Sequence, residues 1–315
     1  MILIVTQRVD GHVDYVVDKL SSARKNKIVR FNTEEFPTSV SIMLSKNPSI
    51  SVMGKNYQLS DFSCVWFRRP ADPYVSQDVV DEVARKYALD ECRNLLNSLW
   101  EGMDWVLWVN KPAKIKAAKH KWSQSAVAQR LGFICPETLV TNNPDEARSF
   151  CSRVGYAIVK PVFTSHFQTR DGWNMIYANP ITSQNPRIQD VELAPAIFQQ
   201  YISKKLELRV TVVGESVFAC AIESQSNEKT KDDWRHYDLD NTPHYQFDLP
   251  KYTEDLCRQI VKYYDLNYGA IDLILTPKGE YVFLELNPNG QWLWIEGMTN
   301  LSISDALIDL LFSHE

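Results

Sequence analysis

The sequence has no apolar stretch that approaches the ~18 consecutive residues of a membrane-spanning helix. It also has no excess of positive charge, because 34 lysines and arginines stand against 39 acidic residues in a chain of 315, a net charge of −5. Proteins that bind nucleic acids normally carry a basic excess or a basic stripe. These absences predict a protein that acts without a membrane and without nucleic acid as a partner.

Cysteine pairs with metal-binding spacing are absent as well. The six cysteines are scattered and none forms a C-x-x-C pair, so neither a zinc site nor a dense disulfide framework is indicated. The first residues, Met1–Thr6, are too short for a signal peptide and lack its basic leading segment. We therefore expect reduced thiols in or near the core, and a cytoplasmic enzyme.

Motifs of several common catalytic sites are missing. The first apolar run, Ile2–Val5, is followed by Gln7–Gly11, which contains no G-x-G-x-x-G dinucleotide fingerprint. The histidines have no regular ligand spacing, and no Ser/His/Asp or Cys/His constellation is recognisable. Neither dinucleotide binding at this turn nor nucleophilic catalysis of these types is indicated.

Turn residues and apolar runs predict three domains. An αβ domain is expected over 1–112, because the proline of Asn110-Lys111-Pro112 stops both a helix and a central strand. A central domain at 113–195 and a C-terminal domain at 196–315 are expected to follow. The αβ domain should contain strands at 2–5, 28–31 and 63–67, helices at 13–23 and 77–100, and a hairpin at 39–59 that turns at Gly54.

Beyond the first domain, the pattern predicts a helix over 113–131 that ends at Gly132, a common residue after a helix end. A hairpin is expected around Gly214, and a helix at 253–264. Two polar, proline-containing stretches, 163–190 and 224–250, are expected to be long loops, which in compact domains are usually functional.

Near the C-terminus two apolar runs flank a Pro277-Lys278-Gly279 turn, a pattern typical of a β-hairpin. With the turn centred on Lys278 and Gly279, Asp272 faces Glu285 across the strands. Asn287 lies two residues further and so points to the same side. The same register predicts Ile274 beside Phe283 on that side and three apolar pairs on the other: Ile271 with Leu286, Leu273 with Leu284, and Leu275 with Val282.

Carboxylates directly opposite each other repel, and burying them is costly unless a cation lies between them. Oxygen ligands from Asp272, Glu285 and Asn287 suit Mg²⁺ or Mn²⁺, and Mg²⁺ usually completes its shell with phosphate and water. The alternative is a solvent-facing hairpin with an acidic outer side. The apolar surroundings of Glu285 in Tyr-Val-Phe-Leu-Glu-Leu favour the metal site.

Here the sequence resembles a known family. Ala270-Ile271-Asp272 followed by Glu285-Leu286-Asn287-Pro288-Asn289-Gly290 is similar to the metal-binding end of ATP-grasp enzymes. The continuation Gln291-Trp292-Leu293-Trp294-Ile295-Glu296 resembles the microviridin-type (graspetide) peptide ligases, which macrocyclise ribosomal peptides, and Trp66-Phe67-Arg68-Arg69-Pro70 fits them too. The resemblance implies an α/β (α+β) ATP-grasp fold with an N-terminal αβ pre-grasp domain, a central domain and a C-terminal antiparallel-sheet domain.

The resemblance also implies roles for individual residues. Lys121, with Lys119 as a competitor, and Lys160 resemble the two nucleotide lysines, and lysine is a compact charge well suited to phosphate. Glu207 matches a ribose-binding acid, although a plain ion pair with Arg209 on the same strand face is the alternative. The hinge whose backbone binds adenine resembles four residues here: Gln199, Gln200, Tyr201 and Ile202. Two arginines, Arg209 and Arg235, are candidates to neutralise phosphate charge.

The implied activity is ATP-dependent macrocyclisation. Side-chain carboxylates of a precursor peptide would become acyl phosphates and then join Ser/Thr hydroxyls or Lys amines. ATP would supply the activation, which fits the missing nucleophile motifs. The implied cofactors are ATP and two Mg²⁺ ions, which Mn²⁺ can replace. The implied partner is a precursor peptide with a leader and an acidic, hydroxyl-rich core. A homodimer is expected from the resemblance alone.

Three points stay open. Arg68 and Arg69 are candidates to contact an acidic peptide. The alternative is that they are a structural pair at a strand end. The segment 161–172 has one glycine where the family has a glycine-rich phosphate loop, so Thr164, Ser165 or Arg170 would have to substitute. The competing functions are a carboxylate–amine ligase of the glutathione synthetase or glutamate-adding type and a nucleotide-binding ATP-grasp module without catalysis.

Overall fold

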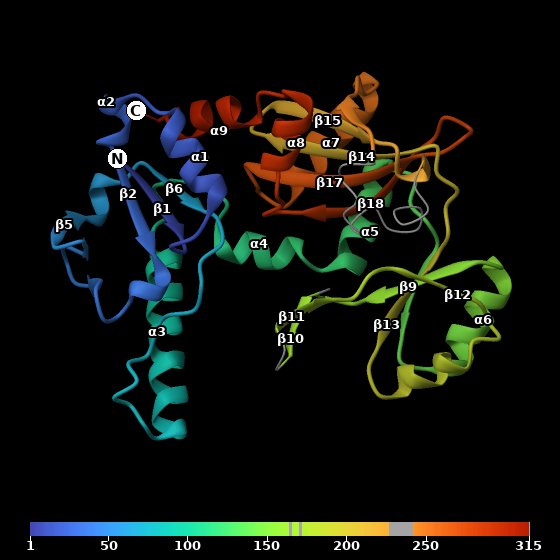
Figure 1. The fold of residues 1–315 in the computed structure, drawn as a ribbon, viewed down its shortest axis with the longest axis horizontal. Helices are drawn as coiled ribbons and strands as arrows, with labels where there is room; N and C mark the ends of the chain where they lie inside the picture. Colours follow the sequence, from blue (N-terminus) through green and yellow to red (C-terminus); the bar gives the residue numbers. More distant parts are fainter. Residues whose placement is uncertain (164–165, 170–171, 227–241, 315) are drawn as a thin grey trace. The chain divides into compact units, whose positions relative to one another are not determined.

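The computed structural model describes residues 1–163, 166–169, 172–226 and 242–314, and the chain forms two compact units (Figure 1). The first unit joins three segments that are distant in the sequence, and the second contains the rest of the chain. The segments of the first unit are Met1–Ile115, Asp265–Tyr268 and Ser302–Glu315, and those of the second are Lys116–Tyr264 and Gly269–Leu301. The three-domain division stays a prediction.

The first unit is built on a parallel sheet with strand order β2-β1-β6-β7. These strands span Ile2–Thr6 (β1), Ile28–Asn32 (β2), Cys64–Phe67 (β6) and Leu107–Val109 (β7). The expected strands at 2–5, 28–31 and 63–67 are thus confirmed, and β1 is buried along its whole length, as its apolar run requires.

Aspartate side chains cap the start of two helices of the first unit. Asp10 caps α1 (Gly11–Lys19) by accepting hydrogen bonds from the His12 and Val13 backbone N–H groups. The expected helix at 13–23 therefore starts earlier, and it is interrupted before α2 (Ser22–Lys25). Asp81 caps α3 (Glu82–Gly102), which explains why this helix starts later than residue 77. Also present are η1 (Thr33–Glu35), η2 (Leu59–Asp61), α9 (Ile303–Leu311) and a sheet of β3 (Ser41–Met43), β4 (Ser49–Val52) and β5 (Lys55–Gln58).

The second unit contains a four-stranded sheet with order β12-β9-β13-β8. Its strands are β8 (Thr138–Thr141), β9 (Ala157–Pro161), β12 (Asn179–Ile181) and β13 (Ala196–Gln200), and α6 (Pro144–Val154) packs on it. The expectation of a long loop over 163–190 is wrong, because β12 and the hairpin of β10 (His166–Thr169) and β11 (Gly172–Met175) lie there, with η3 (Pro186–Glu192). Backbone pairing overrides the polar composition of this stretch.

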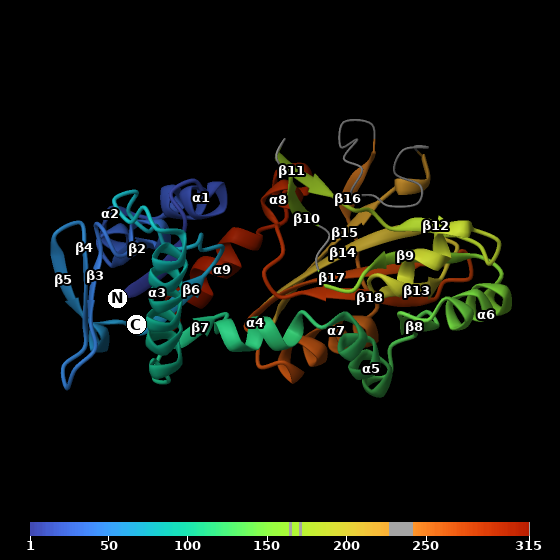
Figure 2. The same ribbon diagram turned by 90° about the horizontal axis from the view of Figure 1, so that it is seen from below.

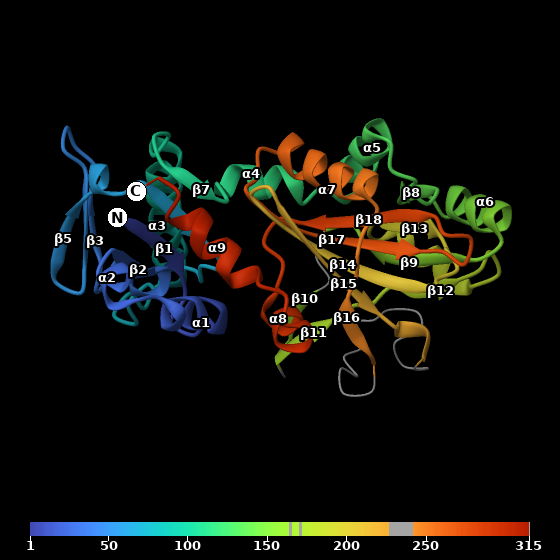
Figure 3. The same ribbon diagram turned by 90° about the horizontal axis from the view of Figure 1, so that it is seen from above.

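A five-stranded antiparallel sheet completes the second unit, in the order β16-β15-β14-β17-β18. Its strands are β14 (Leu206–Val213), β15 (Ser216–Ile222), β16 (His244–Gln246), β17 (Tyr268–Leu275) and β18 (Tyr281–Asn287). α5 (Lys121–Leu131) packs on β18, and α7 (Lys251–Tyr263) packs on β14 and β15 (Figures 2 and 3). α8 (Leu293–Thr299) packs on β16, and η4 (Ser224–Ser226) follows β15.

The helix expected over 113–131 is two helices in the structure. α4 (Pro112–Ala118) ends before Lys119, and α5 begins at Lys121 and ends at Gly132, whose φ of 106° is left-handed as the sequence suggested. The carbonyl of Ala118 accepts a hydrogen bond from the Gln124 side chain instead of continuing the helical ladder. The Gln124 amide therefore caps the end of α4.

The cysteines are free thiols, and four of them are buried: Cys64, Cys151, Cys220 and Cys257. Burial raises the pKa of the Cys220 and Cys257 thiols to about 12, so both are inert near neutral pH. Of the helices in the described part of the chain, none has the length and apolar character needed to cross a membrane.

Candidate functional site

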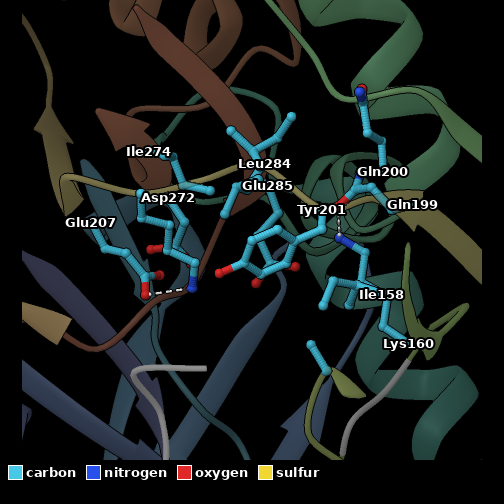
Figure 4. A pocket seen from close by; sticks show the side chains of 13 residues that line it. Ile158, Lys160, Gln199, Gln200, Tyr201, Glu207, Asp272, Ile274, Leu284 and Glu285 are labelled. Carbon is cyan, nitrogen blue, oxygen red and sulfur yellow. Dashed lines mark hydrogen bonds and ion pairs between the residues drawn. The ribbon is translucent and has the colours of Figure 1, made fainter. Parts of the chain in front are cut away.

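A pocket of the second unit lies between its four-stranded and five-stranded sheets (Figure 4). β9 and β13 of the four-stranded sheet form one wall, and β14, β17 and β18 of the five-stranded sheet form the other. Most of the residues singled out in the sequence for nucleotide or metal binding line it: Lys160, Gln199, Gln200, Tyr201, Ile202, Glu207, Asp272 and Glu285. Residues separated by 125 positions in the sequence, Lys160 and Glu285, thus meet in one cavity.

The acidic pair sits at the centre of the β17–β18 hairpin. Asp272 is paired with Glu285 across the strands, as expected from the turn, and Ile271 is paired with Leu286. The rest of the expected register is wrong, because Leu284 has no cross-strand partner. The pairs beyond this β-bulge are Leu273 with Phe283, Ile274 with Val282, and Leu275 with Tyr281.

The bulge decides which side chains reach the pocket. Leu284 and Glu285 are neighbours in the sequence, yet both line the pocket, because the extra residue interrupts the alternation of the strand. Phe283 turns to the opposite face and packs on Phe133, with ring centroids 5.2 Å apart. The bulge therefore adds an apolar wall beside the acidic pair.

Each carboxylate of the pair has a cationic neighbour. The Arg209 Nη1 group donates a 2.7 Å hydrogen bond to Asp272 Oδ1, and both side chains are about nine-tenths buried. Lys121, the first residue of α5, places its Nζ atom 3.5 Å from Glu285 Oε2. Arg209 also donates a 3.5 Å bond to the Gln291 carbonyl. The cations offset the repulsion between the two carboxylates.

Glu207 forms an ion pair with Lys204 and not with Arg209, the partner that the sequence offered as an alternative. Its carboxylate accepts a 2.9 Å hydrogen bond from Lys204, and both side chains are 6% exposed. Arg209, two residues further along β14, bonds Asp272 instead. Lys204 was missed in the sequence, because a lysine before an apolar strand is usually solvated and nothing in the spacing reveals its burial.

The opposite wall carries the candidate nucleotide groups. Lys160 Nζ donates a 2.8 Å bond to Gln199 Oε1, whose amide nitrogen donates to Thr138 Oγ1 at 2.9 Å. The Gln200 and Tyr201 backbone N–H groups donate to the Glu137 and Tyr156 carbonyls, which fixes the path of this segment along the pocket. The Gln200 side chain points away from the cavity, whereas the Tyr201 ring lies inside it (Figure 4).

The donor set of the hairpin fits a hard divalent cation. Asp272 and Glu285 offer carboxylate oxygens, and Asn287 is opposite Ala270 at the end of β18. Asn287 Oδ1 accepts a 3.2 Å bond from the Asn289 N–H and keeps a second lone pair for a metal. No group of three His, Cys, Asp or Glu residues that could hold a metal occurs within the described ranges. A Mg²⁺ ion held by the hairpin residues would complete its shell with phosphate and water oxygens.

Six other candidate residues lie in the first unit or outside the described residues. Arg68 and Arg69 belong to the first unit and follow β6. Arg68 is 2% exposed, and burial lowers the pKa of its guanidinium, while Arg69 is exposed. Thr164, Ser165, Arg170 and Arg235 lie outside the described residues.

Gly290 supports the site through its lack of a side chain. A Cβ atom at this position would lie 2.5 Å from Ala270 Cβ and 3.0 Å from Arg209 Nη2. Glycine therefore allows the turn after β18 to approach Arg209 closely. The sequence signal is the glycine of Asn-Pro-Asn-Gly, but the turn alone does not reveal what approaches it.

We expect Gly290→Ala to lower the free energy of unfolding by about 1–3 kcal/mol, because the added methyl overpacks against Ala270. The matched control is Gly297→Ala in α8, where nothing lies within 4 Å of the new Cβ. The control should be neutral or stabilising by up to about 1 kcal/mol. Urea unfolding of both variants measures this, and equal effects of the two substitutions would contradict the close approach.

Two family models match consecutive parts of the chain. A family model described as an MvdD pre-ATP grasp domain matches residues 1–116, and one described as a RimK-like ATP-grasp domain matches residues 118–311. No curated protein sequence matches the chain.

Solved structures similar to this chain include macrocyclase MdnC from Microcystis aeruginosa MRC, bound with precursor peptide MdnA, at 31% identity and a TM-score of 0.86 over 99% of both chains. A Chryseobacterium gregarium RiPP-associated ATP-grasp ligase, in complex with ADP and a leader and core peptide, is 30% identical, with a TM-score of 0.90 over 100% of this chain and 97% of that chain. Macrocyclase MdnB from Microcystis aeruginosa MRC is 29% identical, with a TM-score of 0.79 over 99% and 98%.

Proposed function

Since the chain belongs to the RimK-like ATP-grasp family, with a pre-ATP-grasp domain of the MvdD type, we propose that it is an ATP-dependent peptide macrocyclase. The family and the α/β ATP-grasp fold expected from the hairpin motif are both confirmed. The proposed reaction joins side-chain carboxylates of a ribosomal precursor peptide to hydroxyl or amine side chains of the same peptide, with release of ADP and phosphate.

The observation that carries this proposal is the shared pocket. Lys160 and the Gln199–Ile202 segment lie on one wall, and Asp272 and Glu285 lie on the other. A nucleotide between the walls would place its phosphates close to both the lysine and the acidic pair. Such a site couples phosphate binding to metal binding, as phosphoryl transfer requires.

The proposed chemistry has two steps. A peptide carboxylate attacks the γ-phosphate of ATP, which forms an acyl phosphate and releases ADP. A hydroxyl or amine of the peptide then attacks the acyl carbon, loses its proton and expels phosphate, so that an ester or amide remains. Mg²⁺ held by Asp272, Glu285 and Asn287 would neutralise charge on the phosphates.

Protein groups in this scheme mainly position charge. We propose that Lys160 and Lys121 bind phosphate oxygens, that Glu207 accepts the ribose hydroxyls and that the Gln199–Ile202 backbone binds adenine. Arg209 lies beside Asp272 and would offset charge on the transferred phosphoryl group. Arg235, by its resemblance to the family, would act with it.

Finer features of the proposal rest on the family. We propose two Mg²⁺ ions, with Mn²⁺ able to replace them, a cytoplasmic location and a homodimer. The chain would divide into three domains, which span residues 1–112, 113–195 and 196–315. Arg69, being exposed, is the better candidate than the buried Arg68 for contact with an acidic segment of the peptide.

The direct test incubates the protein with ATP, Mg²⁺ and the peptide encoded beside its gene, followed by mass spectrometry. The proposal predicts the loss of one water mass per bond formed, with one ADP produced for each bond. Ligation of a free amino acid or another small amine, with no change in the peptide, would favour a ligase of the glutathione synthetase type. Nucleotide binding with neither product would indicate a non-catalytic module.

We expect Lys160→Met to raise the KM for ATP about 10–100-fold, because a hydrogen bond to a charged group is lost at the phosphates. The kcat at saturating ATP should fall less than the affinity. Steady-state ADP release over a range of ATP concentrations measures both constants. The control is Lys262→Met at an exposed position of α7, and an unchanged KM in Lys160→Met would contradict the assignment.

A further inference from the structure

β18 carries Glu285 and Asn287, yet it is an edge strand of the five-stranded sheet. One side of the strand pairs with β17, and the backbone groups on its other side need different partners. At Leu286, the residue between Glu285 and Asn287, a single buried side chain provides them. Gln124 of α5 accepts a 2.9 Å bond from the Leu286 N–H and donates a 2.7 Å bond to the Leu286 carbonyl.

The Gln124 amide thus repeats the pattern of a neighbouring strand's peptide group. Its nitrogen also donates to the Ala118 carbonyl at the end of α4, and the side chain is 2% exposed. One amide therefore joins α4, α5 and β18. A buried amide with all these bonds has little freedom to move.

The contact lies next to an irregular point in the strand. The bulge at Leu284 interrupts the β17–β18 ladder, and bulged strands bend and twist locally. On one side of the bulge the Phe283 N–H donates a 2.8 Å bond to the Ile134 carbonyl, and on the other side Gln124 holds Leu286. The segment from α5 to Ile134 therefore fixes the strand on both sides of the bulge.

The same helix also reaches the carboxylate. Lys121, one turn before Gln124, lies 3.5 Å from Glu285. The first turn of α5 therefore contacts both the side chain of Glu285 and the backbone of the following residue. Metal affinity depends on how well the groups behind the ligands orient them, and loss of such a group typically costs 10–100-fold.

We propose that Gln124 is a positioning residue that sets the geometry of Glu285 and Asn287 for the divalent cation. This inference rests on the proposed function, because it assumes the metal site of the hairpin. Gln124 would act through the backbone of Leu286, whose N–H and carbonyl groups both bond its amide.

The test measures Mn²⁺ affinity of the full chain in the presence of ADP by electron paramagnetic resonance, together with the thermal midpoint of unfolding. Gln124→Met keeps the length of the side chain but removes both bonds to Leu286, and we expect a loss of Mn²⁺ affinity of about 10–100-fold. Gln124→Asn keeps the amide but is one methylene shorter, so a smaller loss is expected. If Gln124→Met fails to fold, the Mn²⁺ affinity of Gln124→Asn tests the inference in its place.

A control separates metal positioning from general destabilisation. Phe150→Leu in α6 leaves a cavity in the core beneath the four-stranded sheet and should lower the thermal midpoint without changing Mn²⁺ affinity. Mn²⁺ affinity within twofold of the wild type in the folded Gln124 variants would overturn the inference. Absence of Mn²⁺ binding in the wild-type protein with ADP would instead count against the proposed metal site itself.

Discussion

Glu285→Gln should lower the rate of peptide ligation at least about 100-fold at saturating ATP and Mg²⁺. Glu285 lies opposite Asp272 in the pocket and supplies one of its two carboxylates on β17 and β18. A neutral amide of the same shape removes one negative charge from the metal site and leaves Lys121 without its carboxylate neighbour. Mass spectrometry of the peptide after a timed reaction measures the rate.

The control for this variant is Glu280→Gln in the turn of the same hairpin. Glu280 is exposed, and its carboxylate accepts a long 3.4 Å hydrogen bond from the Thr276 hydroxyl. Its removal should leave the rate within about twofold, as for most surface changes away from a site. If Glu285→Gln retained more than a tenth of the wild-type rate, the metal assignment would be wrong.

Arg209→Met should lower the free energy of unfolding by about 3–5 kcal/mol, because it leaves the buried Asp272 carboxylate without its 2.7 Å guanidinium partner. The cost comes from the uncompensated charge and not from the lost attraction alone. Asp272→Asn in the same chain removes that charge, so the double variant should recover at least about 1 kcal/mol of the loss. Urea unfolding followed by far-UV circular dichroism measures all three proteins.

An exposed pair of the same length provides the comparison. Arg93 contacts Asp72 at 2.7 Å, but the two side chains are 43% and 67% exposed. Arg93→Met should therefore cost less than about 1 kcal/mol, since water screens the pair. A similar cost for Arg93→Met and Arg209→Met would mean that burial is not what makes the Arg209–Asp272 pair important.

Local patterns in the sequence were sufficient to predict the acidic pair. The turn at Lys278 and Gly279 and the alternation of apolar residues placed Asp272 opposite Glu285, as the structure has them. The same counting failed for Leu273, Ile274 and Leu275, because one unpaired residue, Leu284, shifts every pair between it and the turn. A bulge leaves no mark in the alternation of these apolar residues.

Contacts between distant segments could not be predicted in this way. Gln124 and Leu286 are 162 positions apart, and a glutamine in a helix gives no sign that its amide will complete a strand edge. Gly290 was missed for the same reason, since its role depends on the approach of Arg209. Lys204 was missed although its partner Glu207 is only three residues away, because the sequence does not show that both side chains are buried. The family resemblance supplied Lys160 and the Gln199–Ile202 segment, which spacing alone would not have connected to the hairpin.

Transfer of a carboxylate oxygen from the peptide to phosphate tests the central claim most directly. The precursor peptide is labelled with heavy oxygen in its side-chain carboxylates and incubated with ATP, Mg²⁺ and the protein. Activation as an acyl phosphate predicts one heavy oxygen in the released phosphate for each bond formed, together with ADP. Unlabelled phosphate, or AMP in place of ADP, would contradict the account.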